Sequence, residues 1–147
     1  MTVTAEYRDA WSAEFGIDRV GSLMREILGE EPDGVWSAPG RANLIGEHTD
    51  YNGGLALPIA LPHRAFAALR VRPDRTLRLT SGQERDVIEI DLDRPRPADG
   101  PDPVHGWTAY VAGVLWALES RGYGPLPGLD VVVDSAVPLG SGLSSSA

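Results

Sequence analysis

The sequence contains no cysteine, and all thirteen of its basic residues are arginines, so lysine is absent as well. Without cysteine the chain can form no disulfide, no thiolate metal site and no cysteine nucleophile. Without lysine it has no Walker A lysine, no Schiff-base lysine and no lysine general base. Any site for phosphate in this chain must therefore use backbone amides, hydroxyl groups, arginine or a metal ion.

Long apolar runs and an excess of positive charge are also missing. No apolar run reaches the roughly 18 residues of a membrane span, and the first eleven residues carry acids without the apolar segment of a signal peptide. The formal net charge of −8 argues against a nucleic-acid partner, which needs a basic face. We therefore expect a cytoplasmic protein with no membrane or nucleic-acid partner.

The length of 147 residues, with 42% hydrophobic residues, predicts one globular domain. Two amphipathic helices are expected in the first thirty residues. The first carries an aromatic stripe that reaches Phe15 and stops at Gly16, and the second runs from Val20 to Leu28 and is closed by Gly29.

Strands and one further helix are expected in the rest of the chain. The strand candidates are Val35–Ala38, Leu55–Leu61, Ala65–Arg72, Thr76–Thr80, Val87–Asp91 and Leu129–Val133. Pro39-Gly40 should break the first of these strands, and the second should be buried. Residues 107–118 predict a helix ended by Gly122 and Gly124, with one apolar face formed by Trp107, Tyr110, Val111, Val114, Leu115 and Leu118. Residues 94–103 hold four prolines and predict a surface loop. Helices and strands are interspersed, so the fold class is mixed α+β.

A glycine-serine segment follows the 129–133 strand. Its glycines allow a tight turn and close approach to a ligand, and its serines predict a helix start whose amides and hydroxyls favour an anion, most often phosphate. The residues concerned are Gly140, Ser141, Gly142, Leu143, Ser144, Ser145 and Ser146. A flexible tail, or a serine cap before an ordinary helix, explains the same residues. The segment lacks the glycine-lysine pair of a Walker A loop and the third glycine of a dinucleotide fingerprint.

Polar residues crowd the stretch between two apolar segments that begins at Arg41. They are Arg41, Asn43, Glu47, His48, Asp50, Tyr51 and Asn52. This density suits a pocket that reads hydroxyl groups, because a carboxylate accepts hydrogen bonds from them with defined geometry. Arg41 can keep nearby carboxylates ionised or stabilise charge on a transferring phosphoryl group. A solvated turn and a metal site are the alternatives, and the metal site is disfavoured because no second histidine lies nearby.

Two motifs together resemble one family. GRANLIGEHTDYNGGLALPIAL, from Gly40 to Leu61, resembles the galactokinase signature of the GHMP small-molecule kinases, and PLGSGLSSSA, from Pro138 to Ala147, resembles their phosphate-binding motif. WTAYVAGVLWAL, from Trp107 to Leu118, is similar to a helix of the same family. The resemblance implies that residues 1–147 form the N-terminal domain of this kinase type, a mixed sheet with helices also found in a ribosomal protein. It also implies that the chain is an incomplete N-terminal piece, with a C-terminal domain absent.

The resemblance implies transfer of the γ-phosphoryl group of ATP to the 1-hydroxyl of α-D-galactose. By this likeness Arg41 stabilises the transition state, and the galactose site holds Glu47, His48, Thr49 and Asp50. The segment from Gly140 to Ser146 would surround the ATP phosphates, with Ser146 as a Mg²⁺ ligand. Trp107 and Tyr110 either border the nucleotide or belong to the helix core. The full-length protein is expected to be a monomer.

The sequence departs from the family at three points. Ala42 stands where many members have valine, and Ala109 where many have asparagine. Family members also continue beyond the phosphate motif to a catalytic aspartate, a glutamate ligand for Mg²⁺ and a sugar-contacting tyrosine. We therefore expect these 147 residues alone to be inactive and only marginally folded. A non-catalytic sugar and ATP sensor, and a kinase for a related sugar such as N-acetylgalactosamine or arabinose, remain alternative functions.

Overall fold

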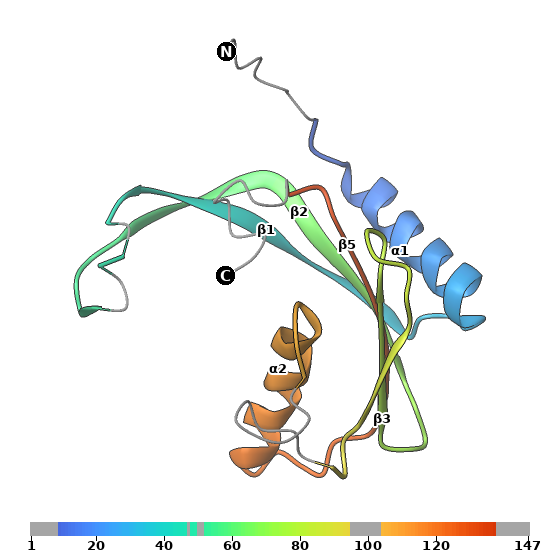
Figure 1. The fold of residues 1–147 in the computed structure, drawn as a ribbon. Helices are drawn as coiled ribbons and strands as arrows, with labels where there is room; N and C mark the ends of the chain where they lie inside the picture. The colour runs from blue at the N-terminus through green and yellow to red at the C-terminus, as the bar shows by residue number, and fades with distance from the viewer. Residues whose placement is uncertain (1–8, 47, 50–51, 95–103, 138–147) are drawn as a thin grey trace, which may run out of the picture.

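The computed structural model describes residues 9–46, 48–49, 52–94 and 104–137, and it places a helix on each face of one five-stranded sheet (Figure 1). The elements are α1 (Ala13–Leu28), β1 (Gly34–Ile45), β2 (Leu57–Val71), β3 (Thr76–Ser81), β4 (Ile88–Asp91), α2 (Thr108–Ser120) and β5 (Leu129–Ser135). The predicted α+β class is confirmed. Within the described residues no helix is long and apolar enough to cross a membrane.

The strands follow the order β1-β2-β5-β3-β4 across the sheet. β5 runs antiparallel to β2 on one side and parallel to β3 on the other, and the two outer pairs, β1 with β2 and β3 with β4, are antiparallel. The strand that comes last in the described sequence therefore lies at the centre of the sheet. Successive side chains of β5 point to opposite faces of the sheet, as they do in any strand, so β5 contributes residues to both faces.

One helix replaces the two that were expected near the N-terminus. The Ser12 side chain caps α1 by accepting a hydrogen bond from the Phe15 amide, and Gly29 ends the helix in a left-handed conformation with φ of 70°, as predicted. Gly16 is not a stop, and the prediction for it was wrong. It lies inside α1, where a Cβ atom would stand 2.3 Å from the Phe66 ring of β2. Glycine at this position lets the aromatic ring pack against the helix backbone.

Pro39-Gly40 does not break β1, which continues to Ile45 and corrects the expected short strand. Pro39 pairs with Arg64, and Arg41 pairs with Ala60, so one residue of β1 lies opposite three residues of β2 between these pairs. This register shift is a bulge that absorbs the irregularity. Proline is tolerated because β1 is an edge strand and needs hydrogen bonds on only one side.

β2 is a single strand that unites the two strands predicted over Leu55–Leu61 and Ala65–Arg72. The first half was expected to be buried, but Leu57 and Ile59 are exposed, and Leu55 before the strand is 93% exposed. The reason is visible in Figure 1, where the β1–β2 hairpin extends beyond both helices. Its apolar side chains therefore have no helix of the described chain above them.

Two apolar clusters lie on opposite faces of the sheet. On the α1 face, Val20, Leu23, Met24, Phe66, Ala68 and Val132 are buried together. On the α2 face the buried residues are Leu77, Leu79, Ile90, Leu115 and Val131. The α2 helix was predicted correctly, and its predicted apolar face was right in part. Leu115 is buried and Trp107 and Val111 pack against the same cluster, whereas Tyr110, Val114 and Leu118 are exposed.

Candidate functional site

The first sequence motif begins beside the end of the described chain after β5, where β1 shifts register. Gly40 is buried in β1, and a Cβ atom there would lie 3.0 Å from Val137 Cγ2. Val137 is itself buried and lies three residues before Gly140, the first residue of the glycine-serine segment. The backbone amide of Ala136 donates a 3.0 Å hydrogen bond to the Arg64 carbonyl of β2. The start of the polar run and the residues after β5 therefore meet, although they are far apart in sequence.

The end of β5 is anchored by a buried carboxylate. Asp134 is 2% exposed and lies in an ion pair with Arg19 of α1. Its Oδ1 also accepts hydrogen bonds from Gln83 Nε2 at 2.7 Å and from the Ser135 amide at 2.8 Å. The Ser135 hydroxyl in turn accepts a 3.0 Å hydrogen bond from the Val137 amide. These contacts fix the backbone on which the glycine-serine segment follows.

Arg41 lies on β1 directly after the bulge, and its side chain is exposed. The register shift determines the direction in which this side chain leaves the sheet, because a strand alternates its side chains between faces. Guanidinium groups present several N–H donors in a plane and bind phosphoryl oxygens in pairs. Arg41 is therefore an exposed cation one residue after Gly40, which approaches Val137.

The hairpin turn between β1 and β2 is closed by hydrogen bonds of Thr49. The Thr49 hydroxyl lies 2.6 Å from the Gly46 carbonyl oxygen and 3.0 Å from that of Leu55. The Thr49 carbonyl accepts hydrogen bonds from the amides of Asn52 at 3.0 Å and Gly54 at 2.7 Å. Both the side chain and the backbone of Thr49 are thus engaged within the turn.

His48 has φ of 63° in this turn, a left-handed conformation that non-glycine residues rarely adopt. Asn52 Nδ2 donates a 2.8 Å hydrogen bond to the His48 carbonyl and holds this peptide in place. Gly46, with φ of 97°, opens the turn, and a Cβ atom there would lie 2.4 Å from the Leu55 carbonyl. The glycine allows the two ends of the turn to come together.

The described residues contain only part of the predicted site. Arg41, His48 and Thr49 lie on β1 and its following turn, as the polar run suggested. Glu47, Asp50 and the segment from Gly140 to Ser146 lie outside the described residues, as does most of the predicted 94–103 loop. Among the residues that the structure describes, no group of three histidine, aspartate or glutamate side chains could hold a metal ion.

Of the two roles considered for Trp107, bordering the nucleotide or belonging to the helix core, the described structure shows packing in the core. Trp107 packs against the buried cluster on the α2 face, and its indole N–H donates a 3.1 Å hydrogen bond to Glu84. Sequence reasoning missed Asp134 as an anchor. The available signal was the position of this acid directly after a run of three valines and two residues after Val132. That spacing places Val132 and Asp134 on one face of β5.

Comparison with known families gives two matches in the sequence. Residues 24–71 match the family described as "Galactokinase galactose-binding signature", and residues 109–147 match "GHMP kinases N terminal domain". The first match contains all of β1 and β2 with the turn between them, and the second contains nearly all of α2, the whole of β5 and the glycine-serine segment.

Curated relatives are named galactokinase. The one from Streptomyces coelicolor is 54% identical over 130 residues, which are 87% of this chain and 32% of that protein. The one from Mycobacterium tuberculosis is 48% identical over 114 residues, or 76% of this chain and 29% of that protein. The chain thus spans about one third of the length of the curated relatives it matches.

Solved structures share the fold. The Lactococcus lactis galactokinase complexed with galactose superposes with a TM-score of 0.68 at 36% identity, over 88% of this chain and 33% of that chain. Methanococcus jannaschii mevalonate kinase superposes with a TM-score of 0.58 at 18% identity, over 76% of this chain and 35% of that chain. The second likeness concerns the fold alone.

Proposed function

Because the chain belongs to the galactokinase family of GHMP kinases, we propose that the protein phosphorylates α-D-galactose at its 1-hydroxyl with ATP. The observation that supports this proposal is the close approach of Gly40, at the start of the polar run, to Val137, which lies three residues before Gly140. In this proposal, that approach lets the polar run that would bind the sugar lie near the segment that would bind the nucleotide phosphates. Phosphoryl transfer requires this proximity, since most of its catalysis is positioning and neutralisation of charge.

In this proposal the polar run orients the sugar. His48 and Thr49 lie in the β1–β2 turn, and Glu47 and Asp50 flank them in the sequence. Carboxylates and imidazole accept or donate hydrogen bonds to sugar hydroxyls, and such groups reject analogues that lack the hydroxyl. The Lactococcus lactis galactokinase was solved in complex with galactose, which supports a sugar of this class.

The proposed nucleotide side combines Arg41 with the segment from Gly140 to Ser146. Backbone amides and serine hydroxyls would hold the phosphates, and the Ser146 oxygen is a hard ligand that suits Mg²⁺. Bound Mg²⁺ would supply neutralising charge to the phosphates. The sugar O1 forms a bond to the γ-phosphorus as the bond to the ADP oxygen breaks, and Arg41 neutralises charge on the transferring group. We propose that a carboxylate outside residues 1–147 takes the hydroxyl proton.

Galactose-dependent release of ADP tests the function. The protein expressed from the complete reading frame that contains this chain should release ADP with galactose and Mg²⁺-ATP, and much less with glucose, arabinose or N-acetylgalactosamine. Binding of galactose and ATP without ADP release would favour the sensor, and a better rate with another sugar would change the substrate. We further propose that this protein acts as a monomer in the cytoplasm.

Replacing Arg41 by alanine should lower kcat by roughly 10²–10³-fold, the usual effect of removing one donor that stabilises a transition state. The KM for galactose should change little, because the arginine is assigned to the phosphoryl group. Arg85→Ala is the matched control, since Arg85 forms an exposed ion pair with Glu26 at 2.9 Å that contributes little to stability. Steady-state kinetics of both variants measure the difference, and equal kcat values would remove Arg41 from the mechanism.

A further inference from the structure

The β1–β2 turn is held together from inside by the side chain of Thr49. Thr49 is exposed as a residue, so its hydroxyl is sterically free to face a ligand. The hydroxyl instead lies within hydrogen-bond distance of two carbonyl oxygens, those of Gly46 and Leu55, on the two sides of the turn. Its one proton is therefore committed to the turn, because a threonine hydroxyl has a single donor.

The backbone of the turn depends on the same residue. The Thr49 carbonyl accepts the amides of Asn52 and Gly54, so three segments of the turn converge on Thr49. A Cβ atom at Gly54 would lie 2.8 Å from Thr49 Cβ, which shows how closely the chain passes this side chain. A change at Thr49 therefore alters the turn rather than one isolated contact.

The residue that this network holds is His48. Its left-handed backbone, with φ of 63°, is costly for a residue with a Cβ atom and persists only where surrounding contacts impose it. The Asn52 side chain donates to the His48 carbonyl at 2.8 Å, and the Thr49 amide donates to the Gly46 carbonyl at 3.2 Å. Both groups belong to the peptide that joins His48 to Thr49, so these two bonds fix that peptide plane on the C-terminal side of His48.

We infer that Thr49 and Asn52 are positioning residues, which hold His48 and the turn in the geometry that receives the sugar without contacting the sugar themselves. This inference rests on the proposed function of the site, and it gives Thr49 a different role from the direct contact that the family resemblance implied. The turn is preorganised by its own hydrogen bonds, so the sugar does not have to order it on binding.

Thr49→Val tests the inference, because valine keeps the shape and removes the hydroxyl. In the protein from the complete reading frame, the KM for galactose should rise roughly fivefold, the effect of one ordinary hydrogen bond. The KM for ATP should stay within twofold. Thr49→Ser, which restores the hydroxyl, should return the KM for galactose to within twofold of the unsubstituted value, and Asn52→Ala should raise it as Thr49→Val does.

Deoxygalactoses separate positioning from direct contact. If Thr49 holds the turn, the rise in KM caused by Thr49→Val should be the same for galactose and for its 2-, 3-, 4- and 6-deoxy analogues. If the hydroxyl binds one sugar hydroxyl, the rise should vanish for the analogue that lacks it, and the inference is then wrong. Ser120→Ala is the control, because it removes a hydroxyl-to-carbonyl hydrogen bond of 3.0 Å at the end of α2.

The remaining outcomes distinguish the inference from the function on which it rests. No galactose turnover by the unsubstituted protein overturns both. Normal turnover with unchanged KM in Thr49→Val overturns the inference alone. A rise in the KM values for galactose and ATP together, with no rescue by serine, would show general damage to the fold and also contradicts a role confined to the turn.

Discussion

Gly40 is the residue that allows β1 to approach Val137, at the end of the chain described after β5. A Cβ atom at this position would lie 3.0 Å from Val137 Cγ2 and 3.5 Å from the His63 carbonyl oxygen. These two distances leave no space for a branched side chain at Gly40. In the proposed site, the absence of a side chain at this one position would set the distance between the sugar side and the phosphate side.

Gly40→Val should therefore separate the two sides and lower kcat/KM for galactose and for ATP, each by roughly 10–100-fold, since small displacements of reacting groups have effects of this size. Adding Val137→Ala makes space and should recover part of the loss. Steady-state kinetics of the single and double variants measure this coupling.

Gly113→Val serves as the control for the loss of a glycine. Gly113 is an exposed residue of α2, and no atom lies within 4 Å of a Cβ placed there. If Gly40→Val retains the kinetics of this control, the contact with Val137 does not position the site. If Val137→Ala brings no recovery in the double variant, the effect of Gly40→Val lies elsewhere in the hairpin.

At the scale of the elements, α1 contains a matched pair of buried glycines. Alanine is normally better than glycine inside a helix by about 1 kcal/mol. At Gly16 the added Cβ would stand 2.3 Å from the Phe66 ring, whereas at Gly21 the nearest atom, Arg25 Nη1, is 3.8 Å away. Gly16→Ala should lower the free energy of unfolding by roughly 1–3 kcal/mol through overpacking, and Gly21→Ala should raise it by up to about 1 kcal/mol.

Urea denaturation of the two variants provides the comparison. Because both glycines are buried in one helix, the difference between them reports the Phe66 contact rather than helix propensity. Equal effects of the two substitutions would mean that α1 shifts away from the sheet at no cost, which would contradict the close packing of the ring against the helix.

Elements whose signals are local could be predicted from the sequence. Gly29 ends α1 in a left-handed conformation that glycine adopts readily, so this end depends on local sequence alone. The strands β3, β4 and β5 follow from short β-rich runs between turn residues. The stops placed at Gly16 and at Pro39-Gly40 were wrong for a common reason. Each depends on a partner far away in sequence, the Phe66 ring for Gly16 and the edge position of β1 for the proline.

Burial was harder to predict than the elements themselves. α2 is apolar on nearly all sides, so periodicity alone could not show that Val111 and Leu115 face the sheet while Val114 and Trp116 face outward. Arg41 and His48 of the polar run lie on β1 and in the turn that follows it, and the binding roles predicted for them stay predictions. The contact of the polar run with the end of β5 was not predictable, because it requires the strand order in which β5 pairs with β2.

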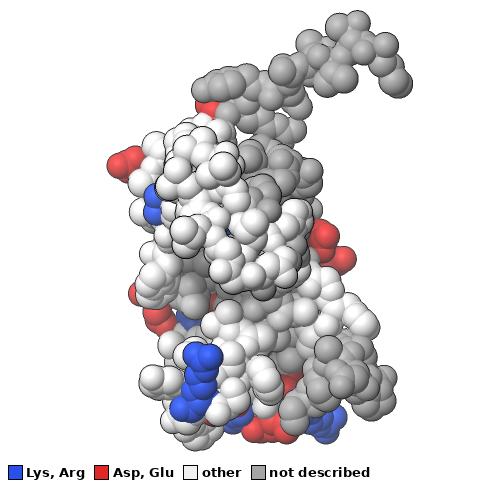
Figure 2. All heavy atoms as spheres, turned by 90° about the vertical axis from the view of Figure 1, so that its left-hand side faces the viewer, with Lys and Arg blue, Asp and Glu red and all other residues white. Residues whose placement is uncertain are grey.

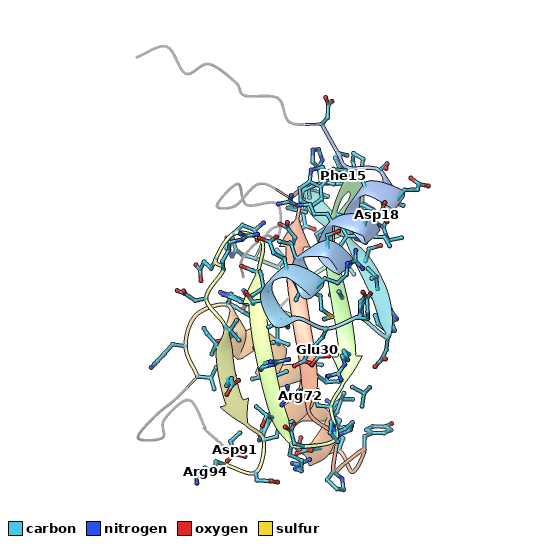
Figure 3. All side chains as sticks on the ribbon, turned by 90° about the vertical axis from the view of Figure 1, so that its right-hand side faces the viewer. Phe15, Asp18, Glu30, Arg72, Asp91 and Arg94 are labelled. Atoms are coloured by element: carbon cyan, nitrogen blue, oxygen red, sulfur yellow. The ribbon has the colours of Figure 1, made fainter. Side chains whose placement is uncertain are left out.

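The whole molecule carries a network of charges at one end of the sheet. Asp130 of β5 is fully buried, and its carboxylate accepts hydrogen bonds from three arginines, Arg70 at 3.1 Å, Arg72 at 2.9 Å and Arg78 at 2.7 Å. Glu30, which follows α1, pairs with Arg70 at 3.3 Å, and it lies over the same face of the sheet as Arg72 (Figure 3). The network joins α1 to three strands.

Because of this network, the free energy of unfolding depends on pH in the acidic range. Burial alone would raise the pKa of Asp130, but hydrogen bonds from Arg78 and Arg72 and their charges outweigh it and lower the pKa. The hydrogen bond from Arg72 lowers the pKa of Asp74 to about 2. A lowered pKa in the folded state stabilises the fold above the unfolded pKa near 4, and that contribution is lost as the pH falls through the folded value.

We expect the free energy of unfolding to fall between about pH 4 and pH 2 as these carboxylates are protonated. Asp130→Asn should destabilise the protein at pH 7 by about 3 kcal/mol, because it leaves three arginines without their buried partner, and it should flatten the acid dependence. Asp18→Asn, on the exposed side of α1, is the control. Denaturation at a series of pH values measures both, and an unchanged acid profile in Asp130→Asn would contradict the assignment.

Large apolar side chains remain exposed on several elements of the described chain. Trp36 of β1 is 59% exposed and Trp116 of α2 is 67% exposed, and Val114, on another side of the same helix, is exposed as well. In Figure 2, which looks toward the tip of the β1–β2 hairpin, charged side chains are sparse and lie mainly at the margins. Exposed apolar surface of this kind promotes association.

The 147-residue chain expressed alone should therefore bind a hydrophobic dye, form soluble aggregates and show no galactose-dependent ADP release. Trp36→Ser combined with Trp116→Gln should raise the monomeric fraction in size-exclusion chromatography. A monomeric unsubstituted chain that unfolds cooperatively without binding the dye would show that these side chains do not need a cover.

The central place of β5 also determines when the sheet can assemble. β2 and β3 do not pair with each other, because β5 lies between them and pairs with both. During synthesis each of these two strands therefore emerges with one edge unpaired, and that edge must wait until residue 135 has left the ribosome. The register between the β1–β2 pair and the β3–β4 pair, and with it the contact between Gly40 and Val137, is set when β5 inserts. A chaperone that protects open strand edges would act in this interval, before the seven residues of β5 close the gap.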